Sequence, residues 1–441
     1  MPPDAGSAQR VEVAVVGAGP AGSAAAITLA RAGIDCLLLD KAEFPRDKCC
    51  GDGLTTGALR LLDELGLDPA GLASFTPVGE LCFRAPSGRT AHIPLPGPPG
   101  VYGAVARRTD LDAALVELAR GAGARLRLGD ALCSLEQPDA AAGPLLRLES
   151  GSTIGASYVV AADGAWSPTR RLLAAGAGSG AAPGTGGAGS GAAPSSGAGS
   201  ARGAGSDWHA FRAYASDVSP EAARRLWVWF ERGLLPGYAW SFPLAGSAAN
   251  VGICLQRGAA VRGRELAAAW ERVLESSFLR SLLGRRARLD PPRSWPIPSA
   301  LQLGALSDRS GRVLFAGDAA CTADPFTGEG VAQAIESGTE AAEAIASARA
   351  GGPSAVAGRY RSAVGRTLAR DHAVARACRA LMARPLGAGL AVAATGARPW
   401  TRSSSARWLF EDWPRGVLLS PGSWRELRRE RPGPFAGRAS S

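Results

Sequence analysis

Apolar runs and helical patterns alternate along the chain. Residues 11–17 (VEVAVVG) form a buried-strand pattern that ends in a glycine, and residues 20–32 read as a helix of small side chains. A second apolar run, CLLLD, follows at residues 36–40. Strand, helix and strand in this order predict a βαβ unit, which in turn predicts a parallel sheet.

Further elements of the same kind recur much later in the chain. A helix is predicted over 111–122, a short strand over 125–128, and buried strands over 157–162 and 312–316. These pieces are expected to belong to the same nucleotide-binding domain, because parallel sheets are assembled from such strand and helix units.

Other segments alternate apolar and polar positions, among them WHAFRAY and GYAWSFPL, which is typical of a largely antiparallel sheet. The pattern therefore predicts an α/β fold, α+β overall, with two interleaved domains. The nucleotide-binding domain is expected over 10–74, 105–173 and 301–352, and the substrate-binding domain over 75–104 and 207–300.

Two segments stand outside this scheme. Residues 174–206 consist almost wholly of Ala, Gly, Ser, Pro and Thr, so they cannot bury enough apolar surface to offset the entropy of ordering. We expect a disordered insertion there. Residues 353–441 are predicted to form a helical, basic region rich in tryptophan and arginine.

Composition excludes several classes of protein. With 46% hydrophobic residues the chain can bury a large core, yet it has no apolar run near the roughly 20 residues that span a bilayer. The N-terminus lacks a signal-peptide pattern, and the eight cysteines include no CxxC pair. Because the cysteines form no disulfide framework, we expect a cytoplasmic protein. The three histidines lie far apart, so no metal site is predicted.

The positive charge is concentrated near the C-terminus. The net charge is +10, and residues 359–438 carry 16 arginines against five acidic residues. This region either contacts anionic phosphate or lipid headgroups, on the inner face of the cell membrane, or is a solvated surface. Nucleic acid is not an expected partner, because no zinc-finger or RNA-binding signature is present.

The sequence GAGPAG at 17–22 matches the dinucleotide fingerprint and lies between a strand and a helix. Gly17 permits the tight turn, Gly19 lets a pyrophosphate approach the backbone, and Gly22 allows close packing of helix and strand. The N-terminus of the helix, with Pro20 and Ala21, supplies amide donors to phosphate. Asp40 ends the second strand, where an acid would bind ribose hydroxyls.

Two later motifs favour FAD over NAD. VVAADGAWSPTRR (159–171) and LFAGDAACTADPFTGEG (314–330) resemble cofactor-binding segments of group A flavoprotein monooxygenases and their relatives. The resemblance assigns cofactor contacts to Asp163, Gly164, Gly317, Asp318, Pro325, Gly328 and Gly330. Arg108 matches an arginine that approaches the FAD phosphates in those proteins, with Arg107 as the alternative.

The stretch PRDKCCGDGL (45–54) narrows the class further. It resembles a segment of the geranylgeranyl reductase family, and so does PGYAWSFPLAGSAANVGICL (236–255). ARWLFEDWPR (406–415) resembles the C-terminal part of bacterial family members that reduce menaquinone. The resemblance implies a Rossmann-type FAD-binding domain, p-hydroxybenzoate hydroxylase-like, interleaved with an antiparallel-sheet substrate domain and followed by C-terminal helices. It also implies contacts of the 41–51 loop with FAD, from Lys41, Arg46, Lys48, Cys50 and Gly51.

The activity that this resemblance implies is saturation of a C=C bond in a polyprenyl chain, by hydride transfer from reduced flavin. The substrate would be a prenyl quinone, prenyl diphosphate or prenyl lipid. Electrons would come from NAD(P)H or a reduced ferredoxin-type protein. An unactivated alkene needs a positioned acid and a dry, apolar channel.

Cys50 matches the cysteine of the family that lies near the flavin, where it could donate a proton or shape the pocket, or could simply be a small buried residue. A redox pair with Cys321 is a further alternative. Tyr238 and Trp240 are the other candidate catalytic positions, and on a strand they share one face with Phe242. These three rings, with Trp227, Trp229 and Phe230, could line the channel, but at least half of the six are expected to belong to the core. Interfacial aromatics at a membrane are expected among Trp400, Trp408, Trp413 and Trp424.

Three other functions were weighed against the reductase. A FAD-dependent monooxygenase would tailor an aromatic or polyketide metabolite through a flavin C4a-hydroperoxide. A flavin-dependent halogenase needs a lysine near its substrate, whereas the only lysines here are Lys41 and Lys48. A flavin-binding protein without catalytic activity is the remaining alternative.

Overall fold

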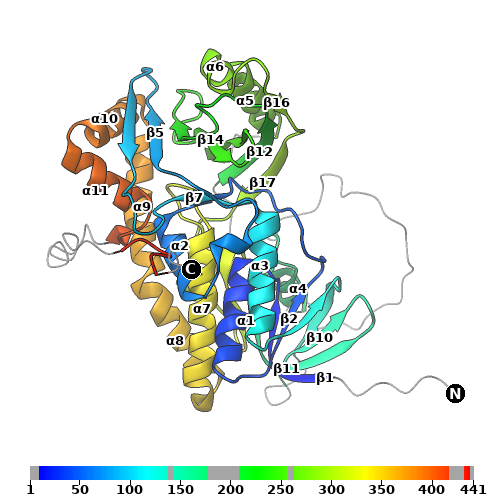
Figure 1. Cartoon of the computed structure of the whole chain (residues 1–441). Helices are drawn as coiled ribbons and strands as arrows, with labels where there is room; N and C mark the ends of the chain where they lie inside the picture. Colours follow the sequence, from blue (N-terminus) through cyan, green and yellow to red (C-terminus); the bar gives the residue numbers. More distant parts are fainter. Residues whose placement is uncertain (1–8, 138–142, 177–207, 257–262, 417–431, 438–441) are drawn as a thin grey trace.

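The computed structural model describes residues 9–137, 143–176, 208–256, 263–416 and 432–437, which contain two large sheets at opposite ends of the molecule (Figure 1). The first sheet has the order β8-β2-β1-β11-β10-β9, and β18 pairs with β11. Its strands are β1 (Gln9–Val16), β2 (Cys36–Asp40), β8 (Arg125–Leu128), β9 (Leu132–Glu136), β10 (Leu145–Leu148), β11 (Thr153–Ala161) and β18 (Val313–Phe315).

Five strands of this sheet, β8, β2, β1, β11 and β18, run parallel, which confirms the prediction from the βαβ pattern. The antiparallel pair β9–β10 beside them was not predicted. Both strands are short and mix charged with apolar residues, so their pattern is weak in the sequence.

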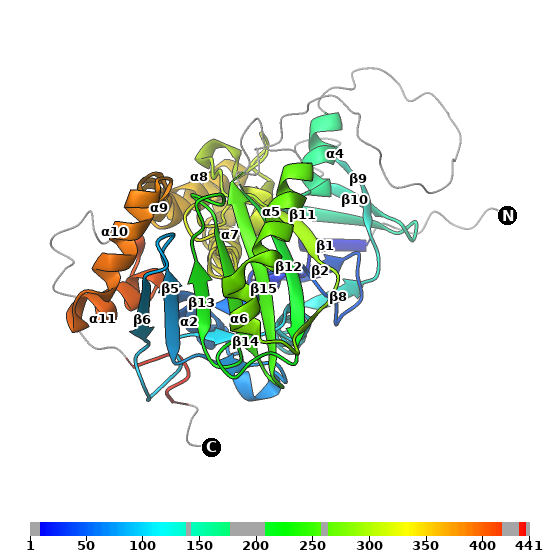
Figure 2. The same ribbon diagram turned by 90° about the horizontal axis from the view of Figure 1, so that it is seen from above.

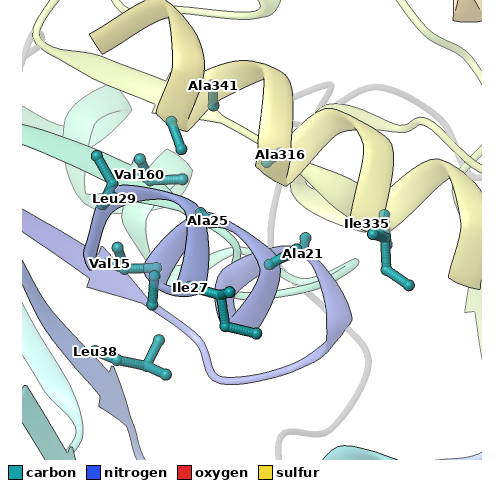
Figure 3. Close-up of a cluster of buried hydrophobic side chains, with 14 of the residues drawn as sticks. Val15, Ala21, Ala25, Ile27, Leu29, Leu38, Val160, Ala316, Ile335 and Ala341 are labelled. Carbon is teal, nitrogen blue, oxygen red and sulfur yellow. The ribbon is translucent and has the colours of Figure 1, made fainter. Parts of the chain in front are cut away.

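Small side chains let helices pack closely against the parallel sheet. Its helices are α1 (Pro20–Arg31), α2 (Thr56–Glu64), α3 (Arg108–Gly121), α4 (Pro168–Gly176) and α7 (Val331–Ala348). Helix α1 lies between the sheet and α7, with Ala25 and Leu29 on α1, Val15 on the sheet and Ala341 on α7 (Figure 3).

The second sheet has eight strands in the order β16-β12-β15-β14-β13-β5-β6, with β17 also paired to β12. All neighbours are antiparallel except β13 and β5. Its strands are β5 (Glu80–Arg84), β6 (Thr90–Pro94), β12 (Trp208–Ser216), β13 (Leu226–Trp229), β14 (Tyr238–Leu244), β15 (Ala248–Gln256), β16 (Arg288–Leu289) and β17 (Arg293–Ile297). Helices α5 (Gly263–Glu275) and α6 (Ser277–Leu283) pack on one face.

Smaller elements connect the two sheets. A three-stranded sheet is formed by β3 (Gly53–Leu54), β4 (Thr76–Pro77) and β7 (Ala104–Val105). Short 3₁₀ segments lie at Pro69–Gly71, Leu303–Ala305, Gly317–Ala320 and Arg349–Gly351.

The helices predicted after residue 352 are present as α8 (Pro353–Arg366), α9 (Leu368–Met382), α10 (Pro385–Gly396) and α11 (Pro399–Leu409). Figure 2 shows α10 and α11 beside β6, at the outer edge of the antiparallel sheet.

The predicted domain boundaries stay a prediction, although every strand of the parallel sheet comes from the three segments assigned to the nucleotide-binding domain. The expected disordered insertion at 174–206 lies outside the described residues, apart from its first three. Those three belong to α4, where the two alanines favour the helix.

A prediction concerns the contact between α1 and α7. A Cβ on Gly338 would lie 2.0 Å from the backbone oxygen of Ala21. We expect Gly338→Ala to force the two helices apart, to cost about 1–3 kcal/mol and to lower Tm by several degrees in thermal unfolding. The matched control is Gly358→Ala on α8, where a Cβ meets nothing within 4 Å. That change should leave Tm unchanged or raise it slightly. Equal Tm values for the two variants would contradict the prediction.

Candidate functional site

A cavity lies between the carboxyl ends of three parallel strands and one face of the antiparallel sheet. Ligands of open parallel sheets bind at this end of the strands. The sheet side is mostly apolar, with Leu81, Phe83, Ala210, Leu226, Val228, Phe230, Tyr238, Trp240, Phe242 and Cys254. The loop side contains Gly19 to Ala21, Lys48 to Thr55, Arg108, Gly164, Gly317, Asp318 and Phe326 to Val331.

One end of the cavity is suited to a pyrophosphate. A Cβ on Gly19, at the N-terminus of α1, would lie 3.7 Å from Nη2 of Arg46 and 4.0 Å from Nη2 of Arg108. The buried carboxylate of Asp112 holds both arginines, accepting from Arg108 Nε at 2.7 Å and from Arg46 Nη1 at 3.1 Å. Helix amides and two guanidinium groups therefore converge where phosphate would bind.

Asp40 lies where the fingerprint predicts it, and its carboxylate also shapes the turn. Oδ2 accepts from the amide of Ala18 at 2.8 Å, and Oδ1 accepts from the amide of Ala42 at 2.9 Å. Lys41, which was expected to contact the cofactor, is exposed and does not line the cavity.

The second FAD motif places Asp318 and the glycine turn on the cavity wall. Asp318 Oδ2 accepts from Lys48 Nζ at 2.9 Å. This ion pair fastens the loop at residues 48–52, called the cysteine loop below, to the 3₁₀ segment Gly317–Ala320. The hydroxyl of Tyr238 donates to the carbonyl of Thr327 and so holds the turn that contains Gly328. Pro325 lies behind this wall, with its carbonyl accepting from Trp208 Nε1.

Asp163 is used to build the fold around the cavity. Its carboxylate accepts from Ser167 Oγ at 2.6 Å and from the amide of Thr169 at 2.8 Å, at the start of α4. Arg170 then donates to the carbonyl of Ala319 at 2.8 Å and lies over the ring of Phe315. Gly164, beside Asp163, does line the cavity.

The expected row of aromatic side chains on β14 is present. The ring centroids of Tyr238 and Trp240 lie 6.1 Å apart, and those of Trp240 and Phe242 lie 6.0 Å apart. All three rings line the cavity, as does Phe230.

Trp227 and Trp229 do not join this row. They lie on the opposite face of the sheet, where both rings contact Phe278 of α6. Of the two alternatives, channel or core, the structure places both tryptophans in the core. The sequence left this open, because LWVWF is apolar at every position and does not show which face is buried.

The cysteine loop is attached to the sheet by a buried hydrogen-bond network. Asn250 accepts from Trp240 Nε1 at 3.0 Å and donates to the carbonyl of Cys50 at 2.9 Å and to Asp52 Oδ2 at 2.8 Å. Tyr214 Oη also donates to Asp52 Oδ2, at 2.8 Å. Asp52 and Asn250 lie in segments that resemble the family, but the sequence predicted no role for either residue.

Asp52 is one of two acids on the cavity wall whose surroundings favour a retained proton. Burial raises its pKa to about 6, although Asn250 and Tyr214 act in the opposite direction. Within the described part of the chain, no donor contacts its buried Oδ1. Burial also raises the pKa of the Cys50 thiol, and raises that of Tyr238 well above its usual range.

Glu329 is a second acid on the wall. Burial, together with Glu411, raises its pKa to about 7. Its Oε1 accepts from the amide of Val331 at 2.9 Å, so this carboxylate is oriented by the first turn of α7.

The segment after α11 also contributes to the cavity. Leu409 and Phe410 line it. Arg415, only 1% exposed, pairs with Asp324 at 2.7 Å and with Glu411 at 3.3 Å. Burial alone would raise the pKa of Asp324, but Arg415 holds that pKa below its usual range. Part of the basic C-terminal region is therefore internal.

The tryptophans expected at a membrane divide in the same way. Trp400 is 75% exposed. Trp408 is partly buried against Phe326 and Arg415, and Trp413 lies under the guanidinium of Arg407. Trp424 lies outside the described residues.

One cluster of potential metal ligands lies away from the cavity. Glu80, Cys82 and His92 come together on β5 and β6, although the sequence predicted no metal site. Arg225 already pairs with Glu80, and burial together with Glu80 raises the pKa of Cys82 to about 12. These conditions disfavour a bound cation, because a thiol must lose its proton to ligate a metal. The cysteines of the described chain, Cys50 and Cys321 included, are free thiols.

Comparison with known proteins agrees with this geometry. Residues 10–183 match the family described as FAD binding domain. The menaquinone reductase of Mycolicibacterium smegmatis is 32% identical over 394 residues, which cover 85% of each chain. The chain belongs to the geranylgeranyl reductase family of FAD-dependent oxidoreductases.

Two further similarities agree with this family. A digeranylgeranylglycerophospholipid reductase of Methanothrix thermoacetophila is 28% identical over 376 residues, covering 82% of this chain and 85% of the relative. A geranylgeranyl bacteriochlorophyll reductase-like protein of Thermoplasma acidophilum shares the fold, with a TM-score of 0.72, 22% identity and coverage of 96% and 100%. The fold is thus p-hydroxybenzoate hydroxylase-like, and the cofactor is FAD.

The cavity fits this cofactor along its length. Its phosphate end offers Gly19 with two arginines, whereas the other end offers glycine backbone beside aromatic rings. A Cβ on Gly51 would lie 3.4 Å from the ring of Phe242 and 3.6 Å from that of Trp240. We propose that the phosphates lie against Arg46 and Arg108 and that the flavin ring lies between the cysteine loop and the turn at Gly328.

A prediction follows for the phosphate end. Arg108→Ala removes one guanidinium, and Asp112→Asn removes the charge that holds both. Because hydrogen bonds to charged groups contribute about 1.5–3 kcal/mol, we expect either change to raise the Kd for FAD roughly 10- to 100-fold. Quenching of flavin fluorescence during reconstitution measures this Kd. Arg125→Ala, which breaks an exposed pair with Asp35, is the control and should retain the original affinity.

Proposed function

We propose that this FAD-dependent prenyl reductase saturates a C=C bond in the polyprenyl chain of a quinone, diphosphate or lipid. The observation that carries the proposal is the row of Tyr238, Trp240 and Phe242, which forms an apolar wall opposite the cofactor loops. An extended hydrocarbon chain would bury its surface against such a wall. The names of the relatives, menaquinone reductase and digeranylgeranylglycerophospholipid reductase, agree with a prenyl substrate.

The protein must supply a proton to complete the reaction. Reduced FAD supplies a hydride to one carbon of the double bond, and an acid supplies a proton to the other, so the product gains two hydrogens. We propose Asp52 as the source of this proton. Asp52 lies on the cavity wall beside Cys50. The backbone amide of Asp52 donates a hydrogen bond to Cys50 Sγ at 3.4 Å.

Cys50, Tyr238 and Trp240 are less suited to this role, and Glu329 is the alternative that a variant must test. Burial makes Cys50 and Tyr238 weaker acids, and the hydroxyl of Tyr238 is engaged with Thr327. The only side-chain donor of Trp240, Nε1, already donates a hydrogen bond to Asn250. We therefore assign Cys50, Tyr238 and Trp240 to shaping and orienting the site, with the proton on Asp52.

The decisive experiment is anaerobic single turnover of the chemically reduced enzyme with menaquinone, followed by mass spectrometry. We expect a product heavier by two hydrogens, with reoxidation of the flavin. Geranylgeranyl diphosphate and a prenylated glycerophospholipid test the other substrate classes. Flavin that stays reduced with all three would overturn the proposal.

The same assay in air tests the monooxygenase, which stays a prediction from the sequence alone. Incorporation of oxygen into the product would favour it. The electron donor, NAD(P)H or a reduced ferredoxin-type protein, is also still a prediction. Flavin reduction by each donor under anaerobic conditions distinguishes them.

A pH dependence follows from the position of Asp52. An acid must be protonated to act, so kcat/KM should fall above a pH of about 6, where Asp52 loses its proton. Asp52→Asn should reduce turnover at least tenfold and retain FAD. It should also abolish the fall in kcat/KM above a pH of about 6, which is the basic limb of the pH profile. Tyr214→Phe removes a hydrogen bond to the ionised form and should move the limb to higher pH.

Glu329→Gln is the matched control, because that carboxyl has a raised pKa on the same wall. The limb should persist in this variant. If it disappears there and survives in Asp52→Asn, the proton comes from Glu329 instead.

A further inference from the structure

The outer face of α10 is unusually apolar for an exposed helix. Leu386 and Leu390 are 75% and 59% exposed, and their spacing of four residues places them on one face. Leu381, in the last turn of α9, and Trp400, in the first turn of α11, are also exposed. Four of the six large hydrophobic side chains exposed in the described part of the chain thus belong to this one region. We call these four residues the apolar face.

Positive charge surrounds the apolar face. Arg376, Arg384 and Arg398 are exposed on α9 and on the two turns that flank α10. The whole stretch from 373 to 410 contains six arginines and no acidic residue. Exposed leucines and a tryptophan beside arginines combine the apolar area and the positive charge that favour contact with an anionic bilayer.

The inner face of the same helix packs against the cavity. Ala388 and Val392 are buried with Phe230, and Tyr238 and Phe326 pack against the same cluster. These three aromatic residues line the cavity. A single helix, about 10 Å across, therefore separates the apolar face from the cavity wall.

We propose that the apolar face docks on an anionic lipid bilayer, and that the prenyl chain passes from the bilayer to the cavity beside α10. The first part stands on the exposed leucines and the surrounding arginines. The second part rests on the proposed function. No helix in the described ranges is long and apolar enough to cross a membrane.

Vesicle sedimentation tests the docking without any turnover. The full-length holoenzyme should pellet with vesicles of phosphatidylcholine and phosphatidylglycerol at low salt, and much less with phosphatidylcholine alone. The double change Leu386→Ser with Leu390→Ser should lower the partition coefficient at least tenfold. Arg384→Gln with Arg398→Gln should remove most of the dependence on salt and on phosphatidylglycerol.

Leu289→Ser is the matched control, because this leucine is 39% exposed on the antiparallel sheet, away from α10. It should bind vesicles as the unchanged protein does. Failure of the unchanged protein to pellet at low salt, or full binding by the leucine variant, overturns the proposal. If the same leucines instead hold a dimer together, light scattering will show a monomer only in the variant, with no vesicle binding in either form.

A second comparison separates docking from chemistry. The leucine variant should turn over prenyl substrate in detergent micelles at the original rate. Its rate should fall at least tenfold when the substrate is embedded in vesicles. Equal loss in both media would overturn the route beside α10. Absence of turnover with vesicle binding intact would contradict the proposed function and leave the docking in place.

Discussion

The geometry of the cavity depends on the side-chain amide of Asn250. This fully buried group accepts from Trp240 and donates to both Cys50 and Asp52, which lie about two hundred residues earlier in the chain. Each buried polar group left without its partner would cost about 1–3 kcal/mol, so the network strongly favours one arrangement. The aromatic row, the cysteine loop and the acid keep their relative positions because one amide joins them.

The other side of the cavity is fixed by a buried charge. Arg415 pairs with Asp324 and Glu411, and removing one partner from such a group typically costs 3–5 kcal/mol, because the remaining charge stays buried. The segment after α11 must therefore remain against the turn that ends at Gly330. This constraint places the C-terminal helices beside the cavity, so that one face of α10 packs behind the cavity wall and the other face is exposed.

The sequence predicted those parts of the site that depend on local spacing. The fingerprint at Gly17, the strand ending at Asp40 and the parallel sheet need only neighbouring residues, and Arg108 lies one helical turn from Asp112, its partner. Asp52, Asn250 and Tyr214 act through contacts across the fold, so their spacing carries no signal. The side on which Trp227 and Trp229 lie stayed open for a related reason, since a strand that is apolar throughout does not show which side faces a ligand. The arginines near the C-terminus form one basic region in the sequence, but the fold divides them between buried ion pairs and an exposed rim.

Burial links the acid to the substrate proposed for it. The pKa of Asp52 is raised because protein, rather than water, surrounds its carboxyl. A prenyl chain that fills the cavity would displace water and surround this carboxyl further, and by the same physics would raise its pKa again. The proton would then be held most firmly when a double bond is in place, whereas an empty cavity would release it more readily. In the proposed reaction, an apolar wall of Tyr238, Trp240 and Phe242 would thus act twice, because it would bind the hydrocarbon and help the acid to retain its proton.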